Sequence, residues 1–251
     1  MRSSKSGASF VAKDPHLLAV IPARGGSKRL PRKNVLPLAG KPLIAWTIET
    51  ALASKLFGEV LVSTDDEEIA EASRRCGASV PWLRPAALST DTALSIDVVR
   101  HAADWYAARG RPLDAVVLLQ PTSPFRRAQS LRRAVEAFVR HGADRPLVSI
   151  SPASPHPAWC FMLDNDRMTP FVDWNSITHR SQDLPPAYSL NGAIYIFPMQ
   201  LLREGAAWLS ADTIGFVIDD QEESCDIDTP MDWQIATLIA ERLAAERSGP
   251  H

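Results

Sequence analysis

A loop rich in glycine and basic residues contains the first side chains that could do chemistry. It spans residues 21–34, with the sequence IPARGGSKRLPRKN, and follows an apolar run, residues 17–21, that predicts a buried β-strand. Gly25 and Gly26 allow a tight turn and a close approach of the backbone to a ligand. Backbone N–H groups and cationic side chains together bind phosphate oxygens, so the loop predicts a triphosphate site. The cations of the loop are Arg24, Lys28, Arg29, Arg32 and Lys33.

A solvated basic turn is the simpler interpretation of this loop. Pro22 and Pro31 restrict its two ends, which favours a fixed ligand site instead. The loop also follows a strand, at the end where open α/β sheets bind ligands. Its spacing matches neither GxxxxGK[ST] nor GxGxxG, so the sequence predicts neither an ATPase nor a dinucleotide-binding enzyme.

A pair of carboxylates near the end of the chain, Asp226 and Asp228, forms the second candidate site. Residues two apart on an extended segment point to the same side, so the two carboxylates predict a site for Mg²⁺, with Mn²⁺ as a substitute. Acidic pairs are common on protein surfaces, and a lone DxD is a weak signal. A phosphate-binding loop in the same chain strengthens it, because Mg²⁺ takes its other ligands from phosphates and water.

These segments resemble a known family, the CMP-sialic acid synthetases (N-acylneuraminate cytidylyltransferases). The loop resembles the family signature IPAR(S/G)GSKx(L/I)PxKN, and Gly40 to Ile44 resembles the GKPLI run of sugar nucleotidyltransferases. The resemblance covers about residues 17–240 and extends to a D-x-D just before the last helix. It implies that CTP is bound by Arg24, Gly26, Ser27, Lys28, Lys33 and Asn34, with Arg24, Lys28 and Asp228 acting in catalysis.

Two further segments resemble motifs of the same family. Residues 120–126, QPTSPFR, are similar to its LLQPTSP(L/F)R motif, in which the glutamine contacts the sugar acid. Gln120 offers both a donor and an acceptor for that role. Arg84, with the following LSTD run, resembles the second motif, whose arginine lies beside the cytosine. Without the resemblance, the first segment reads as a proline turn before a helix and Arg84 as a surface residue.

A third segment departs from the family pattern. RSQDLP at residues 180–185, with NGAIY at residues 191–195, resembles the family's RRQDLP and NGAIY, but Ser181 replaces an arginine. The resemblance implies that Arg180, Gln182 and Asn191 bind the substrate acid. RSQDL is similar to enzymes for pseudaminic acid, whereas NGAIY is similar to those for sialic and legionaminic acids.

The elements that must position these residues alternate between strands and helices. Such alternation predicts an α/β fold, a Rossmann-like nucleotidyltransferase with a mostly parallel central sheet flanked by helices. After the first strand, strands are predicted at residues 59–63, 78–82, 113–120, 146–151, 191–197 and 213–218. Helices are predicted at residues 41–54, 64–76, 93–108, 129–141 and 230–247.

The chain is predicted to be one domain, residues 15–251, after a disordered tail, residues 1–14. A stretch dense in proline and aromatic residues, residues 151–186, shows no helical period and predicts an insertion that needs a partner. The family resemblance implies that this insertion is a dimerisation arm, exchanged in a homodimer, whose tip reaches the neighbour's active site.

The composition of the 251 residues excludes several classes of partner. A net charge of −2 gives no basic field for nucleic acid or a membrane, so the basic loop suits a small anionic ligand. The three cysteines are an odd number without a CxxC pair, which predicts reduced thiols in a cytoplasmic protein and no structural zinc.

Together these features predict a cytidylyltransferase that joins CTP to a nonulosonic acid and releases pyrophosphate. The first candidate for the acid is N-acetylneuraminate. The alternatives are CMP activation of legionaminate, pseudaminate or Kdo, although the Kdo enzymes usually read GKP where this chain has residues 32–34, RKN. A glycosyltransferase with a DxD metal site and a non-catalytic nucleotide-binding relative are the rivals from other classes. No side chain stands out as a general base.

Overall fold

We analysed a computed structural model of the chain, which describes residues 14–205, 207 and 209–248. A six-stranded sheet forms its centre, in the order β10-β6-β9-β5-β1-β4. Strand β9 is antiparallel to both of its neighbours, and the other pairs are parallel, so the mostly parallel sheet predicted from the sequence is confirmed. The strands are β1 (Leu17–Pro22), β4 (Phe57–Ser63), β5 (Ala115–Leu118), β6 (Leu147–Pro152), β9 (Tyr188–Pro198) and β10 (Ile214–Val217). The predicted tail lies outside the described residues, apart from Asp14.

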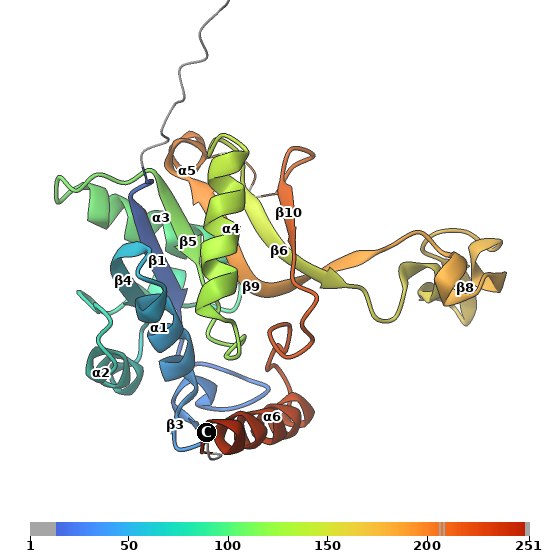
Figure 1. The fold of residues 1–251 in the computed structure, drawn as a ribbon, viewed down its shortest axis with the longest axis horizontal. Helices are drawn as coiled ribbons and strands as arrows, with labels where there is room; N and C mark the ends of the chain where they lie inside the picture. Colours follow the sequence, from blue (N-terminus) through green and yellow to red (C-terminus); the bar gives the residue numbers. More distant parts are fainter. Residues whose placement is uncertain (1–13, 206, 208, 249–251) are drawn as a thin grey trace, which may run out of the picture.

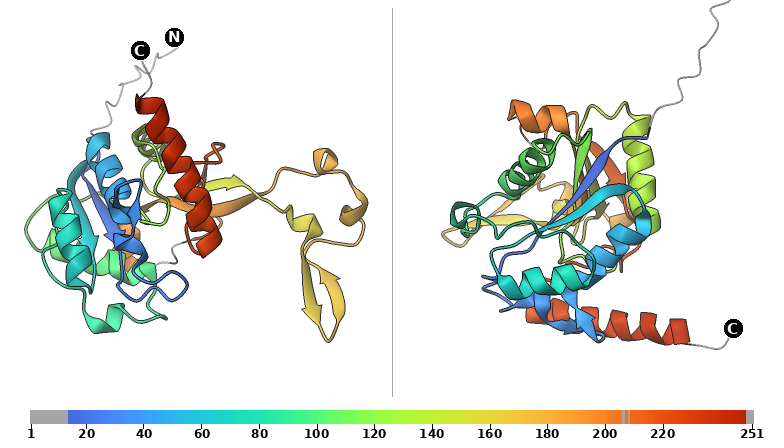
Figure 2. Two further views of the ribbon diagram at one scale, coloured as in Figure 1. Left: turned by 90° about the horizontal axis from the view of Figure 1, so that it is seen from below. Right: turned by 90° about the vertical axis from the view of Figure 1, so that its left-hand side faces the viewer.

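Helices cover both faces of this sheet (Figures 1 and 2). One face carries α1 (Leu43–Ser54), α2 (Glu67–Arg75) and α4 (Ala128–Arg140), and the other carries α3 (Ser95–Ala107) and α5 (Met199–Glu204). Within β1, Ala19 and Ile21 pack into the first layer, whereas Leu18 and Val20 pack into the second. Both faces are therefore buried, which explains why the strands are continuous apolar runs in the sequence.

The last helix, α6 (Pro230–Ser248), packs apart from these layers. It forms a third apolar cluster with Phe125, Ile227 and Leu38. Leu38 belongs to a short hairpin of β2 (Pro37–Leu38) and β3 (Lys41–Pro42). Thr229 caps the helix: its Oγ1 accepts from the N–H of Asp232, whose carboxylate accepts from the N–H groups of Asp228 and Thr229. These bonds hold the pKa of Asp232 below its ordinary value although burial acts in the other direction. The predicted start of this helix is confirmed.

One predicted strand is wrong. Residues 78–82 form one isolated bridge, between Ser79 and Leu61, and a second one follows between Leu83 and Thr64, so the segment is not a strand of the sheet. Ser79 makes two backbone hydrogen bonds to β4, and Pro81 then has no N–H to continue the ladder. The segment instead becomes a loop that carries Arg84 back to the edge of the sheet.

An arm projects from the sheet between β6 and β9 (Figures 1 and 2). It contains the hairpin β7 (Phe161–Asp164) and β8 (Arg167–Pro170) and three short 3₁₀ turns, Pro157–Trp159, Ser176–Thr178 and Ser181–Asp183. Phe171 and Trp174 are 62% and 61% exposed, and Leu163 is 69% exposed. The arm therefore presents a large apolar surface that no described residue of this chain covers. No helix of the described part of the chain is long and apolar enough to cross a membrane.

Candidate active site

A cavity of about 580 Å³ opens beside the basic loop that follows β1. It joins three segments that are far apart in the sequence: this loop, the loop that follows Arg84, and the residues after β5. The structure thus brings together these residues singled out from the sequence: Arg24, Ser27, Lys28, Lys33, Asn34, Arg84, Gln120 and Asp228. It also includes Arg29 of the loop cations and adds others that had no assigned role, among them Thr90, Asp91, Ser95 and Thr122.

The basic loop is held in place through its glycine backbone. The N–H of Gly25 donates to Oδ1 of Asp65 at 3.0 Å, and the N–H of Ser27 donates to the carbonyl of Gly25 at 3.0 Å. A Cβ on Gly25 would lie 2.7 Å from Oδ2 of Asp66, so any larger residue there would push on the N-cap of α2. A Cβ on Gly26 would meet no other atom within 4 Å, and Gly26 does not line the cavity.

Asp91 neutralises two cations of the loop. Its carboxylate lies 2.9 Å from Nη1 of Arg24 and 2.5 Å from Nζ of Lys28, and Arg24 also donates to the carbonyl of Thr90. Hydrogen bonding from Lys28 and the two positive charges lower the pKa of Asp91 below its ordinary value. The sequence reveals the cations, but their acidic partner is found only once the two loops are folded together.

Lys33 connects the basic loop to the carboxylate pair. Its buried ammonium donates to the carbonyl of Ile227 at 2.5 Å and to Oδ1 of Asp228 at 2.9 Å. Next to it, Asn34 donates from Nδ2 to the carbonyl of Arg24, while its buried Oδ1 has no partner among the described residues. The loop thus brings a free acceptor and a fixed cation to the cavity.

Arg84 is a buried guanidinium at the cavity wall. Its Nε donates to Ser89 Oγ, and its Nη2 lies 3.6 Å from Oδ1 of Asp65, too far for a hydrogen bond. Burial lowers the pKa of Arg84, and the charge of Asp65 acts against that shift. Asp65 therefore faces Arg84 and accepts from Gly25, so it links the basic loop to the loop of Arg84.

The carboxylate pair lies beside the segment that follows β5. The N–H of Ile227 donates to the carbonyl of Thr122 at 2.9 Å, and Ile227 is fully buried between the two aspartates. The pKa of Asp226 is raised because its carboxyl is buried and because Asp228 carries a negative charge nearby. A hydrogen bond with Thr122 acts in the opposite direction. Asp228 lines the cavity, whereas Asp226 does not.

The donor set of this pair fits Mg²⁺. No cluster of three or more His, Cys, Asp or Glu that could bind a metal is found among the described residues, so the chain offers two carboxylates here. Two hard oxygen donors suit an ion that takes its remaining ligands from phosphates and water.

The residues implied to bind the substrate acid are not together. Gln120 lines the cavity, whereas Arg180 and Gln182 lie on the arm and are exposed. The amide of Asn191 is buried: its Oδ1 accepts from Ser149 Oγ and from the N–H of Ala193, and its Nδ2 donates to Ser151 Oγ. Of these four residues, Gln120 is therefore the one that lines the cavity within a single chain.

Several known proteins are similar to this chain. Residues 18–169 match a family model described as cytidylyltransferase. The chain is 42% identical to a CMP-N,N'-diacetyllegionaminic acid synthase of Legionella pneumophila over 90% of its own length and 96% of the relative's. It is 36% identical to a pseudaminic acid cytidylyltransferase of Campylobacter jejuni, over 88% of its own length and 95% of the relative's. It is 34% identical to an N-acylneuraminate cytidylyltransferase of Escherichia coli, over 90% of its own length and 52% of the relative's.

Solved structures share the fold. A CMP:2-keto-3-deoxy-manno-octonic acid synthetase complexed with CTP has a TM-score of 0.67 at 20% identity, over 90% of this chain and 99% of that one. A 4-diphosphocytidyl-2C-methyl-D-erythritol synthase from Anaerococcus prevotii has a TM-score of 0.63 at 14% identity, over 92% of this chain and 100% of that one. At these identities the likeness extends to the architecture alone.

Proposed function

Because this chain belongs to the cytidylyltransferase family, we propose that it transfers CMP from CTP to a nonulosonic acid and releases pyrophosphate. The observation that carries the proposal is the cavity in which the basic loop, buried Arg84 and the Gln120 segment face one another. Such a cavity offers cations for a triphosphate, a planar donor for a base and a polar side chain for a sugar acid.

In this proposal the two halves of CTP bind different walls of the cavity. Arg24, Ser27 and Lys28 bind the phosphates through charge and hydrogen bonds. Arg84 and Asn34 bind the cytidine, since one has a donor, Nη2, and the other an acceptor, Oδ1, without a hydrogen-bond partner among the described residues. Each group is fixed before the ligand arrives, which reduces the entropy lost on binding.

The reaction follows from the position of these groups. The anomeric hydroxyl of the acid attacks the α-phosphorus of CTP, the bond to the β-phosphate breaks, and pyrophosphate leaves. The cationic loop stabilises the charge of the leaving group, and Lys33 orients Asp228 at the cavity. When bound by Asp226 and Asp228, Mg²⁺ supplies charge that stabilises the phosphates and acidifies the attacking hydroxyl.

The relatives narrow the choice of acid. The sequence motifs favour N-acetylneuraminate, but the legionaminate synthase is more similar than the N-acylneuraminate enzyme, and the chain covers only about half of the latter's length. We therefore take N,N'-diacetyllegionaminic acid as the first candidate and N-acetylneuraminic acid as the second. Ser181, in place of the family arginine, lies on the arm and supports a departure in how the acid is bound.

We further propose that the protein is a homodimer in which the arm contacts the second subunit. The exposed aromatic residues of the arm need a partner, and Arg180 and Gln182 are on it rather than at the cavity of their own chain. In a homodimer with exchanged arms, the arm of one protomer covers the apolar surface of the other and brings Arg180 and Gln182 to its neighbour's cavity. The carboxylate of the acid then meets an arginine at the open side of the site.

One assay tests the proposed function. The protein is incubated with CTP, Mg²⁺ and, in turn, N,N'-diacetyllegionaminic, N-acetylneuraminic, pseudaminic and Kdo acids, and pyrophosphate release is measured. We expect release only when a nonulosonic acid is present, with the legionaminic acid turned over fastest. Release without any acid, or with Kdo alone, would contradict the proposal. The Lys28→Ala variant serves as the matched negative control.

A further inference from the structure

Arg126 is a charged residue in the interior of the protein. It is 2% exposed and is the largest fully buried side chain among the described residues. Burial lowers the pKa of its guanidinium to about 9, and the charge of Glu223 acts against that shift. Among the described residues, the guanidinium bonds to two backbone carbonyls and a hydroxyl, not to a carboxylate. A charge buried in this way is costly, so its hydrogen bonds must hold well-defined groups.

The guanidinium joins three separate elements. Its Nε donates to the carbonyl of Ala193 in β9 at 2.6 Å, and its Nη2 donates to the carbonyl of Gln120, just after β5, at 2.9 Å. Its Nη1 lies 3.5 Å from Oγ1 of Thr47 in α1, and that hydroxyl is also 3.5 Å from the carbonyl oxygen of Gln120. The planar fork of an arginine can meet all three at fixed angles, which a lysine cannot do.

One of the two carbonyls belongs to Gln120, which contacts the substrate acid in the proposed function, and the other belongs to Ala193 in β9. Gln120 lines the cavity, and its Oε1 lies 3.5 Å from where a Cβ on Gly192 would stand. Gly192 has a φ of +73° and precedes Ala193 at the point where β9 leads back toward the arm. The fork therefore fixes the Gln120 peptide relative to the base of the arm. The hydrogen bonds of Arg126 to described residues go to Ala193, Thr47 and Gln120, and none of these belongs to the basic loop.

We propose that Arg126 is a positioning residue for the sugar acid: it sets the orientation of Gln120 against β9 and leaves the nucleotide side untouched. This inference rests on the proposed function. It assigns a specific effect to a residue that does not line the proposed substrate cavity. Loss of the fork should weaken recognition of the acid while CTP binds as before.

The test compares Arg126→Met and Arg126→Lys with the wild-type protein. Steady-state kinetics give the KM for the acid that the wild type uses best, and calorimetry gives the Kd of CTP in the absence of acid. We expect the KM for the acid to rise about tenfold or more in both variants, as for a lost charge-assisted hydrogen bond, while the Kd of CTP changes less than about twofold. A substitution in α4 that only loosens the core, Phe138→Leu, serves as a control for stability and should leave both constants unchanged.

Other outcomes separate the possible failures. Equal changes in both constants, an unchanged KM for the acid, or full rescue by the lysine would overturn the positioning role. If neither Arg126 variant folds, Thr47→Val is measured instead, because it removes the hydroxyl that contacts both Arg126 and the carbonyl of Gln120. A KM for the acid in Thr47→Val equal to that of the wild type would overturn the positioning role. A wild type that releases no pyrophosphate with any acid refutes the proposed function itself.

Discussion

The carboxylate of Asp91 lies 2.5 Å from the ammonium of Lys28. In the free chain it therefore forms an ion pair with a cation that we assign to the phosphates of CTP. The same carboxylate lies 2.9 Å from Arg24. An anion that binds both cations must separate them from Asp91 or share them with it. The ion pairs with Asp91 thus hold the loop in one conformation before CTP binds. The same carboxylate then competes with the phosphates of CTP for Arg24 and Lys28.

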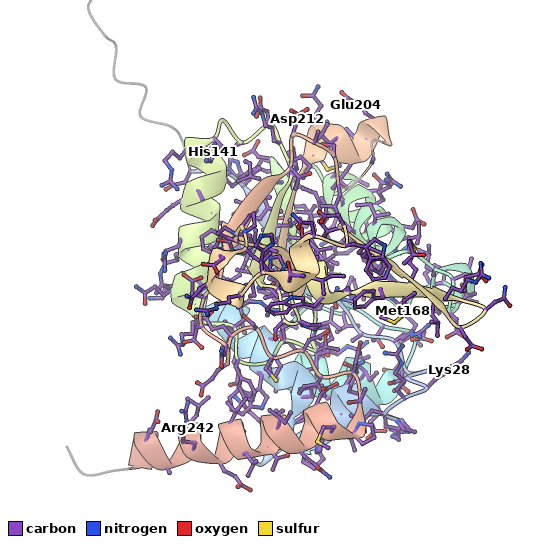
Figure 3. The ribbon with its side chains drawn as sticks, turned by 90° about the vertical axis from the view of Figure 1, so that its right-hand side faces the viewer. Lys28, His141, Met168, Glu204, Asp212 and Arg242 are labelled. Atoms are coloured by element: carbon purple, nitrogen blue, oxygen red, sulfur yellow. The ribbon has the colours of Figure 1, made fainter. Side chains whose placement is uncertain are left out.

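The Asp91→Asn variant should therefore bind CTP more tightly, by a few-fold, because exposed ion pairs contribute little each. Calorimetric titration with CTP alone measures this change. Asp212→Asn is the matched control, since Figure 3 shows Asp212 at the end of the molecule away from Lys28. Weaker binding in Asp91→Asn would mean that the carboxylate organises the loop rather than competing with the ligand.

The pH dependence of this competition follows from the lowered pKa of Asp91. A carboxylate whose pKa is depressed in the folded chain keeps its ion pairs above its ordinary pKa and loses them as the pH falls through the lowered value. The ratio of the CTP Kd values of wild type and Asp91→Asn should hence stay constant across the neutral range. A ratio that changes between slightly acidic and slightly basic pH would show that another group controls the loop.

Removal of a loop cation should affect turnover and leave folding unchanged. Arg24→Ala and Lys28→Ala should each lower kcat/KM about 10²-fold or more, because each removes preorganised charge at the phosphates. The Lys28 side chain is 76% exposed, so its thermal midpoint should equal that of the wild type. Kinetics and calorimetry on the same preparations check both points, and near-normal activity would exclude the loop as the phosphate site.

Lys33 should differ from its exposed neighbours because its ammonium is buried and bonded. Lys33→Met keeps the length and apolar stem but leaves Asp228 and the carbonyl of Ile227 without their donor. Breaking a buried ion pair costs 3–5 kcal/mol, and since Asp228 is half exposed we expect about 1–2 kcal/mol here. Urea denaturation of Lys33→Met and of Lys28→Met, as the exposed control, measures the difference. Equal stabilities would contradict a structural role for Lys33.

The carboxylate pair should make activity depend on a divalent cation. EDTA should abolish activity and Mg²⁺ or Mn²⁺ restore it, and Asp228→Asn should lose most activity, since the ion is the largest charge opposing the phosphates. Folding of Asp228→Asn should persist, which circular dichroism checks. A wild type that works in EDTA, or an Asp228→Asn variant retaining more than about a tenth of the rate, would remove the metal from the proposal.

Mixed dimers can test whether the arm acts on the neighbouring chain. Lys28→Ala damages the cavity and Arg180→Ala damages the arm, so a dimer of one protomer of each kind has one intact site only if the arm reaches across. Co-expression with two affinity tags isolates this dimer, and we expect its turnover to be well above that of either parent variant. Activity no higher than that of the parents, or a monomer in light scattering, would show that the arm serves its own chain.

Much of this architecture can be predicted from the sequence because its strands are buried on both faces. The apolar run at residues 17–21 lies within β1 (Leu17–Pro22), and the strand predicted at residues 113–120 contains β5 (Ala115–Leu118). The basic loop and the carboxylate pair are equally visible, since several charged residues cluster at short spacing. The strand predicted at residues 78–82 is wrong because Pro81 has no N–H to continue the ladder that Ser79 begins with β4.

The missed residues depend on tertiary contacts. Asp91 is one of many acidic loop residues until the folded chain brings it to Lys28, and Arg126 reads as an exposed charge at the start of a helix although it is buried. Arg180 and Gln182 illustrate a different limit. Their motif is recognisable, but the cavity that they serve in the proposed dimer is on another copy of the chain.

The reversed direction of β9 has a consequence for how this enzyme can evolve. Pro152 at the end of β6 pairs with Tyr188 at the start of β9, so the arm leaves and re-enters the sheet on adjacent strands. An insertion with its two ends side by side can be exchanged as a cassette without repairing the sheet, the basic loop or the carboxylate pair. Replacement of this one surface segment would thereby change which sugar acid the enzyme accepts, while the residues that bind the nucleotide stay the same.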